Sequence, residues 1–185
     1  YLLTEGGDNL LKNGSVKIVG VDVAEKAPFW LRLTAKGLPG HGSRPVADSA
    51  TNRLVRAMNR ILDWETPLKL SPAVEQFFKD VAPLQPEPLR SQFANIAASL
   101  KDPAFVKWLS GQREYNFLVR NTISLTMLSG SKQTNVIPNT ATCNLDVRLL
   151  PGESPEEFLK ALRNVIADPS IQIENINRFK AANSS

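Results

Sequence analysis

Strict alternation of apolar and polar residues marks the strands of a half-covered sheet in this chain. Three segments show the alternation, 29–35, 122–128 and 140–149, and the segment 171–176 is predicted to be a last strand. Successive side chains of a strand point to opposite faces, so this period predicts a sheet with one buried and one exposed face. An earlier run, from Ser15 to Ala24, has apolar residues on both faces, and we expect it to belong to a different sheet.

Two other segments have the period of amphipathic helices. Between 47 and 63 the apolar residues form one stripe, whose members are Ala50, Leu54, Ala57, Met58, Ile61 and Leu62. A second helix begins at Ser154-Pro155, an N-cap followed by proline at the first helical position, and ends at Asp168-Pro169. The order strand, helix, strand, strand, helix, strand predicts an α+β fold of the ferredoxin-like βαββαβ type. In this fold a four-stranded antiparallel sheet is covered on one face by two helices.

The segment 67–118 interrupts this order and is predicted to be a helical insertion. Ser71-Pro72 and Asp102-Pro103 each have the pattern of a helix start, and the apolar residues of 89–100 recur at helical spacing. We therefore expect two or three short helices. The insertion is rich in aromatic residues, which we interpret as a small local core, with an apolar wall beside a binding cleft as the alternative. Residues 1–14 are predicted to be a loop.

Charge and the counts of cysteine and histidine limit the function classes. The formal charge of +4 comes from 22 Lys and Arg against 18 Asp and Glu, and the basic residues are dispersed, which is a weak case for nucleic acid. No apolar run approaches the roughly 20 residues of a membrane span. With one His and one Cys, the chain cannot by itself build a zinc site of three or four nitrogen and sulfur ligands. Cys143 falls on the inward face of its strand and is predicted to be a core residue.

The only histidine, His41, lies in a loop, 37–45, that contains three glycines and two prolines. Glycine permits positive φ and a close approach by another surface, and proline stiffens the flanks, so the loop is suited to presenting the imidazole. The alternative is an ordinary turn between a strand and a helix with an incidental histidine.

Three separated motifs carry a resemblance to a known family. They are Thr4-Glu5-Gly6-Gly7, the segment 37–43 around His41, and Asn135-Val136-Ile137-Pro138 leading to Asp146-Val147-Arg148. Together they resemble the di-zinc metallopeptidases that include aminoacylase, acetylornithine deacetylase, succinyl-diaminopimelate desuccinylase and carboxypeptidase G. The insertion is most similar to the branch with Gly-X carboxypeptidase and secreted N-acyl amino acid hydrolases.

The resemblance implies the organisation of a longer protein. Residues 25–178 would be its lid, or dimerisation, domain, with the helical insertion at 67–118. Residues 1–24 would be the end of the first segment of the zinc catalytic domain, and 179–185 the link back to it. The family implies two zinc ions in the full-length enzyme, whereas none is expected to bind this chain, which we expect to be inactive by itself.

The resemblance also implies roles for four residues. Glu5 matches a zinc ligand, although Thr4 stands where an acid is common in that branch. His41 matches a histidine that, in a homodimer formed by the lid domain, reaches into the active site of the partner subunit and polarises the scissile carbonyl. Asn135 and Arg148 match residues that hold the substrate, and Arg148 would grip its free carboxylate. The implied substrates are peptides or N-acyl amino acids.

Two other functions are compatible with the arrangement. An RNA-recognition module has the same order of strands and helices but needs aromatic residues on its central strands, and neither 122–128 nor 140–149 contains one. A self-association domain without catalysis is the stronger rival, because an exposed edge strand alone can pair two chains. The exact substrate stays open, as does the choice between a cytoplasmic and an exported soluble protein.

Overall fold

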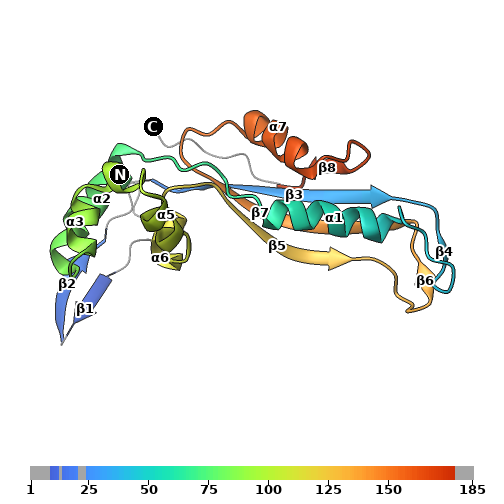
Figure 1. The fold of residues 1–185 in the computed structure, drawn as a ribbon, viewed down its shortest axis with the longest axis horizontal. Helices are drawn as coiled ribbons and strands as arrows, with labels where there is room; N and C mark the ends of the chain where they lie inside the picture. Colours follow the sequence, from blue (N-terminus) through green and yellow to red (C-terminus); the bar gives the residue numbers. More distant parts are fainter. Residues whose placement is uncertain (1–8, 13, 21–23, 178–185) are drawn as a thin grey trace.

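The computed structural model describes residues 9–12, 14–20 and 24–177 (Figure 1). Its centre is a four-stranded antiparallel sheet in the order β5-β7-β3-β8. The strands are β3 (Ala27–Lys36), β5 (Thr122–Ser129), β7 (Thr140–Leu149) and β8 (Gln172–Asn175). This is the strand order of a ferredoxin-like sheet, so the predicted α+β fold is confirmed.

Helices α1 (Ala50–Leu62) and α7 (Pro155–Ile166) pack on one face of this sheet. The central strands β3 and β7 pair along their whole length, and alternate side chains of both are buried beneath the helices. Burial of a large aliphatic side chain contributes about 1.5–3 kcal/mol. The strongest part of the core therefore follows these two strands, whose buried residues are Phe29, Leu31, Leu33, Ala35, Ala141, Cys143, Leu145, Val147 and Leu149.

The ends of α1 differ from the prediction. The helix begins at Ala50 rather than 47, because Ser49 is the N-cap and its Oγ accepts a hydrogen bond from the N–H of Asn52 at 3.2 Å. Leu62, predicted to be buried, is 67% exposed, because it is the last helical residue and lies at the end of the helix that covers the sheet. The predicted start of α7 at the Ser154 cap is confirmed.

The insertion forms a core of its own. Within the described residues it contains five short α-helices and a 3-10 turn, more than expected, because the predicted helix over 89–100 breaks at Asn95, whose φ of −119° and ψ of 43° are not helical. Phe78 and Phe93 are fully buried, and their rings pack edge to face with 4.9 Å between the ring centroids. The local-core interpretation is confirmed. The elements are α2 (Pro72–Val81), η1 (Ala82–Leu84), α3 (Leu89–Ala94), α4 (Ile96–Ser99), α5 (Pro103–Ser110) and α6 (Arg113–Asn116).

A hairpin precedes the central sheet. Its strands, β1 (Asn9–Lys12) and β2 (Ser15–Val19), form a two-stranded sheet, and the turn uses Gly14 at a φ of +72°, which glycine adopts without steric cost. Within the described ranges β2 pairs only with β1, so the expectation of a separate sheet is confirmed. The prediction of a loop is wrong for 9–12.

The molecule is elongated. Figure 1 shows the insertion and the β1-β2 hairpin at one end, and the short strands β4 (Gly40–His41) and β6 (Val136–Ile137) at the other. These two strands, which were not predicted, pair antiparallel beyond the end of the central sheet. Among the helices of the described chain, none combines the length and the apolar character that crossing a bilayer requires.

Candidate functional site

Two loops far apart in the sequence form one ribbon at the end of the molecule. We call this ribbon the tip and define it as residues 37–45 and 133–139. His41 pairs with Val136 in the antiparallel ladder of β4 and β6. Backbone hydrogen bonds of 3.0 and 2.7 Å between the two loops continue the pairing on both sides. The tip is therefore held by its own backbone, although it extends beyond the main core.

Gly37 allows the tip to pack against the start of α1. A Cβ atom at this position would come within 2.6 Å of the backbone nitrogen of Ala50 and 3.1 Å of the carbonyl carbon of Ser49. The glycines at positive φ in the described chain are Gly14 and Gly152 instead. The expectation that glycines of the histidine loop supply positive φ is thus wrong, and close approach explains Gly37.

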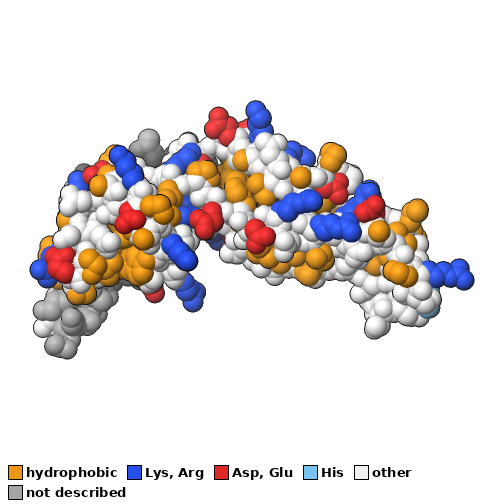
Figure 2. Space-filling model, in the orientation of Figure 1, with side chains coloured by type: hydrophobic (Ala, Val, Ile, Leu, Met, Phe, Trp, Pro, Cys, Tyr) orange, Lys and Arg blue, Asp and Glu red, His pale blue; other side chains and the backbone are white. Residues whose placement is uncertain are grey.

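His41 is exposed at the tip, where Figure 2 shows the pale blue histidine at that end of the surface. The backbone N–H of Ser43 donates to its Nδ1 at 3.2 Å, and the Ser43 hydroxyl lies 2.8 Å from the same nitrogen. In a neutral imidazole the nitrogen that accepts from a backbone N–H carries no proton, so the proton is assigned to Nε2. The ring is thereby fixed as a hydrogen-bond donor.

Asn135 lies beside the donor nitrogen of this ring. Its side-chain amide nitrogen is 3.5 Å from Nε2 of His41. Because oxygen and nitrogen of an amide can be exchanged by a rotation of the group, Asn135 can offer either an acceptor or a donor at this place. The structure thus brings together two of the predicted site residues, and both side chains are exposed.

Arg148 lies on the face of β7 opposite the helices, together with Asp146. Its Nε donates to Oδ1 of Asp146 at 2.7 Å, and its Nη2 donates to Oδ2 at 3.1 Å. The hydrogen bonds to Asp146 raise the pKa of the Arg148 guanidinium above its already high usual value. Asp146 occupies one edge of the planar group and leaves the Nη1–Nη2 edge for another carboxylate.

Arg148 and the tip lie at opposite ends of the sheet. Strand β7 begins beside the tip at Thr140 and reaches Arg148 eight residues later. At roughly 3.3 Å per residue, this is about 26 Å of strand. A dipeptide-sized substrate cannot span that length, so one chain cannot place His41 and Arg148 on the same molecule.

A partly buried amine lies near Arg148. Lys26 Nζ donates to the carbonyl oxygens of Phe117 and Arg120 at 3.1 and 2.8 Å and to Oγ1 of Thr122 at 3.1 Å. Burial, and secondarily the charge of Arg148, lowers the pKa of Lys26 from 10.5 to about 8. We call Lys26, Asp146 and Arg148 the basic cluster.

Sequence reasoning included Ser43 and Asp146 in the motifs without giving them a role, and it missed Lys26. The spacing of two residues between Asp146 and Arg148 on a predicted strand places both on one face and could have indicated the pair. Lys26 had no such signal, because its partners are backbone carbonyls about 90 residues away.

The described residues do not fit a pair of zinc ions. They contain no group of three or more His, Cys, Asp and Glu side chains placed to share a metal ion. Cys143 is buried as predicted, and burial raises the pKa of its thiol to about 11, which disfavours the thiolate that a metal needs. Glu5, the predicted ligand, lies outside the described residues.

Comparison with known proteins identifies the family. Residues 23–174 match the family model described as the peptidase dimerisation domain. The N-fatty-acyl-amino acid synthase/hydrolase of Xenopus tropicalis is 30% identical over 183 residues, which cover 97% of this chain and 35% of that protein. The probable carboxypeptidase S-like 2 of Dictyostelium discoideum is 28% identical over 165 residues, 89% of this chain and 31% of that protein. The structure of human carnosine dipeptidase 1 aligns with 85% of this chain and 39% of its own at 11% identity, with a TM-score of 0.48.

The chain spans about a third of the length of the two curated relatives. The motifs around His41, Asn135 and Arg148 predicted this relationship, and the matched region includes all three residues. The chain belongs to the peptidase dimerisation domain family.

Proposed function

We propose that this chain is the lid of a zinc-dependent hydrolase that cleaves the amide bond of N-acyl amino acids or of peptides with a free carboxylate. The observation that carries the proposal is the exposed pair of His41 and Asn135, with the imidazole held as a donor. The contact from Ser43 is local to the turn, whereas Asn135 comes from a loop 94 residues away and lies beside the other nitrogen of the ring. The names of the two relatives, a hydrolase of acylated amino acids and a carboxypeptidase, agree with amide cleavage.

The residues of this chain would act on the carbonyl and on the carboxylate of the substrate. As an amide carbonyl is attacked, its oxygen gains negative charge, and a pre-aligned N–H donor stabilises it. Nε2 of His41 is such a donor, since Ser43 fixes the ring through Nδ1. Asn135 would hold the substrate beside it, and the free edge of Arg148 would bind the carboxylate.

The metal belongs to another part of the proposed enzyme. Two zinc ions, with Glu5 as one ligand, would be held by the catalytic part of the full-length protein, because the described residues supply no ligand group for them. We therefore propose that the 185-residue chain is inactive without that part.

A homodimer would join the two separated regions. Strand β5 is at the edge of the sheet and exposes Met127 and Leu128, and α1 exposes Val55 and Leu62. An unpaired edge with apolar side chains is suited to a twofold contact with a second copy. We propose that β5 pairs antiparallel with its copy.

This pairing has a direct consequence for the site. The Ser129 end of β5 leads to the tip, and its Thr122 end lies opposite Arg148. Antiparallel pairing sets the Ser129 end of one chain beside the Thr122 end of the other. His41 of the partner subunit would therefore lie closer to Arg148 of this chain. Within one chain the two residues are separated by the length of β7.

Mixed dimers of the full-length enzyme test the proposal. His41→Ala and Arg148→Ala proteins are each expected to be nearly inactive toward an N-acyl amino acid. After the two are mixed and their subunits exchanged, half of the dimers combine both variants, and one of their two sites has both wild-type residues. About a quarter of the wild-type activity should return.

The outcome separates the alternatives. No recovery after proven subunit exchange would mean that the two residues act from the same chain. Normal activity of both single variants would instead favour a self-association domain in which His41 and Arg148 have no part in catalysis.

A further inference from the structure

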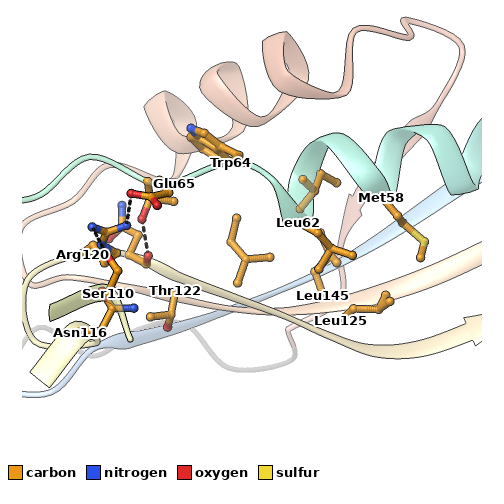
Figure 3. Close-up of a pocket in the computed structure, with 14 residues that line it drawn as sticks. Met58, Leu62, Trp64, Glu65, Ser110, Asn116, Arg120, Thr122, Leu125 and Leu145 are labelled. Atoms are coloured by element: carbon orange, nitrogen blue, oxygen red, sulfur yellow. Dashed lines mark hydrogen bonds and ion pairs between the residues drawn. The ribbon is translucent and has the colours of Figure 1, made fainter. Parts of the chain in front are cut away.

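A cavity lies on the helix-covered face of the sheet, opposite the face that carries Arg148. Its volume is about 260 Å³, and it is bounded by the last turns of α1, by β5 and by the end of the insertion (Figure 3). This is slightly below the roughly 300–1,000 Å³ of pockets for drug-sized ligands, so a small molecule would fill it.

The cavity has an apolar end. Figure 3 shows Met58 and Leu62 of α1 facing Leu125 of β5 and Leu145 of β7 across it. Ile61 and Ile123 complete this wall. β5 is the edge strand, and its inward-facing Ile123 and Leu125 are only partly buried, so α1 leaves part of the inner face of β5 uncovered. The apolar end is therefore open to a short alkyl or aryl group.

The other end of the cavity contains a buried guanidinium. The side chain of Arg120 is only 7% exposed, its Nη1 lies 3.3 Å from Oε2 of Glu65, and its Nη2 donates to Oγ of Ser110 at 3.2 Å. Two further atoms, Nε of Arg120 and Oδ1 of Asn116, are buried and have no hydrogen-bond partner within the described chain. Both residues line the cavity. The hydrogen-bonding capacity of this end is thus incompletely used.

The charge of Arg120 is weakly compensated. Glu65, its ion-pair partner, is 72% exposed and lies at a long distance for a charge-assisted bond. The Lys26 amine does not compensate this charge, because it is itself a cation and contacts Arg120 only at the backbone oxygen, at 2.8 Å. A buried charge is costly unless a partner of opposite charge compensates it. This end of the cavity therefore favours an anion.

The frame around Arg120 is rigid. Oγ1 of Thr66 donates to the carbonyl oxygen of Asn121 at 2.6 Å, and the backbone N–H of Leu150 donates to Oδ1 of Asn121 at 2.7 Å. A preorganised site of this kind loses little conformational entropy when a ligand binds.

We propose that this cavity binds a small amphipathic carboxylate, with the carboxylate on Arg120 in the place of Glu65 and the carbon chain along the apolar wall. We propose a carboxylate rather than a larger anion for two reasons. The carboxylate of Glu65 already contacts this guanidinium, and one negative charge balances the charge of Arg120. The roles proposed for His41 and Arg148 do not use this cavity, although Leu62 of its wall also lies on the proposed dimer surface.

Calorimetric titration of the 185-residue chain with octanoate tests the proposal. One octanoate per chain should bind, whereas acetate, which lacks the chain, and octan-1-ol, which lacks the charge, should each bind at least about tenfold more weakly. Equal binding of octanoate and octan-1-ol, or no octanoate binding at millimolar concentration, would overturn the proposal.

Two variants with opposite expected effects sharpen the test. Arg120→Gln should weaken octanoate binding by at least about tenfold, and Glu65→Gln should tighten it severalfold, because the competing carboxylate is removed. Glu65 is exposed, so its variant is expected to fold even where loss of the buried arginine disturbs the chain. Unchanged or weaker binding by Glu65→Gln contradicts the proposed position of the carboxylate.

The remaining alternative is that a second copy of the chain covers the cavity in a dimer. Octanoate binding should have the same stoichiometry per chain at protein concentrations that favour monomer and dimer. Loss of octanoate sites on dimerisation would show that the partner chain fills this cavity and would overturn the proposal.

Discussion

The tip and the basic cluster lie at opposite ends of the same sheet and differ in exposure and in charge. The tip holds the polar pair His41 and Asn135 on an exposed ribbon that contributes little to the core. The basic cluster holds charges at the other end of β7, where Lys26 is partly buried and Arg148 is paired with Asp146. The difference agrees with the proposal that the tip enters the active site of a partner subunit, whereas the basic cluster binds the carboxylate of the substrate.

The largest expected effect comes from removing the donor at the tip. In the full-length enzyme, His41→Ala should lower kcat by about 100- to 1,000-fold, the usual effect of losing one oxyanion donor, while the bound zinc stays unchanged. Steady-state kinetics with zinc analysis by atomic absorption checks both parts. Ser43→Ala is the matched control, because the backbone N–H that orients the ring is retained. Near-normal turnover of the histidine variant would remove the oxyanion role.

Sequence patterns were sufficient for the main sheet but not for the tip. Strand β7 occupies the predicted residues 140–149, because ten residues of strict alternation exceed what a short turn or helix would show. Strands β4 and β6 contain two residues each, so they have no period to detect. Their pairing depends on loop geometry set by residues about 95 positions apart.

The candidate site was predictable as a set of residues but not as an arrangement. The motifs marked His41, Asn135 and Arg148 together, yet a single chain separates Arg148 from the other two by the length of β7. The order of residues in the sequence does not show which loops pair in space. The distance between a residue on a strand and a distant loop is therefore unknown until the strand pairing is known. The partners of Lys26 were unpredictable for a related reason, since backbone carbonyls are the same for every residue type.

The next effect concerns the connection between the tip and the core. Gly37→Ala should lower the free energy of unfolding by about 1–3 kcal/mol, because its Cβ would overlap the backbone of α1. Chemical denaturation of the chain measures the loss. Gly40→Ala is the control in the same loop, since its Cβ would be 3.6 Å from the nearest atom, a side-chain carbon of Ile137. Equal destabilisation by both changes would argue against a specific requirement at Gly37.

A smaller effect is expected at the basic cluster. Asp146→Asn keeps an acceptor for the guanidinium but removes the charge, and should raise KM by about two- to fivefold with little change in kcat, because the pair is partly exposed. Kinetics of the full-length enzyme on an N-acyl amino acid measures the split. A fall in KM would show that Asp146 competes with the substrate for Arg148 rather than orienting it.

The smallest effect is a pH dependence of stability that comes from Lys26 of the basic cluster. The pKa of Lys26 is about 8 in the folded chain and 10.5 as its ordinary value, so between these pH values the unfolded chain binds more protons. Stability should therefore gain a small contribution from Lys26 as pH rises from about 8 to 10.5, which solvent screening keeps modest. Thermal unfolding of Lys26→Met across this range should lack that contribution, whereas His41→Gln should retain it. Identical pH profiles for wild type and Lys26→Met would mean that the amine is not held in the partly buried, charge-repelled position that distinguishes this end of the sheet from the tip.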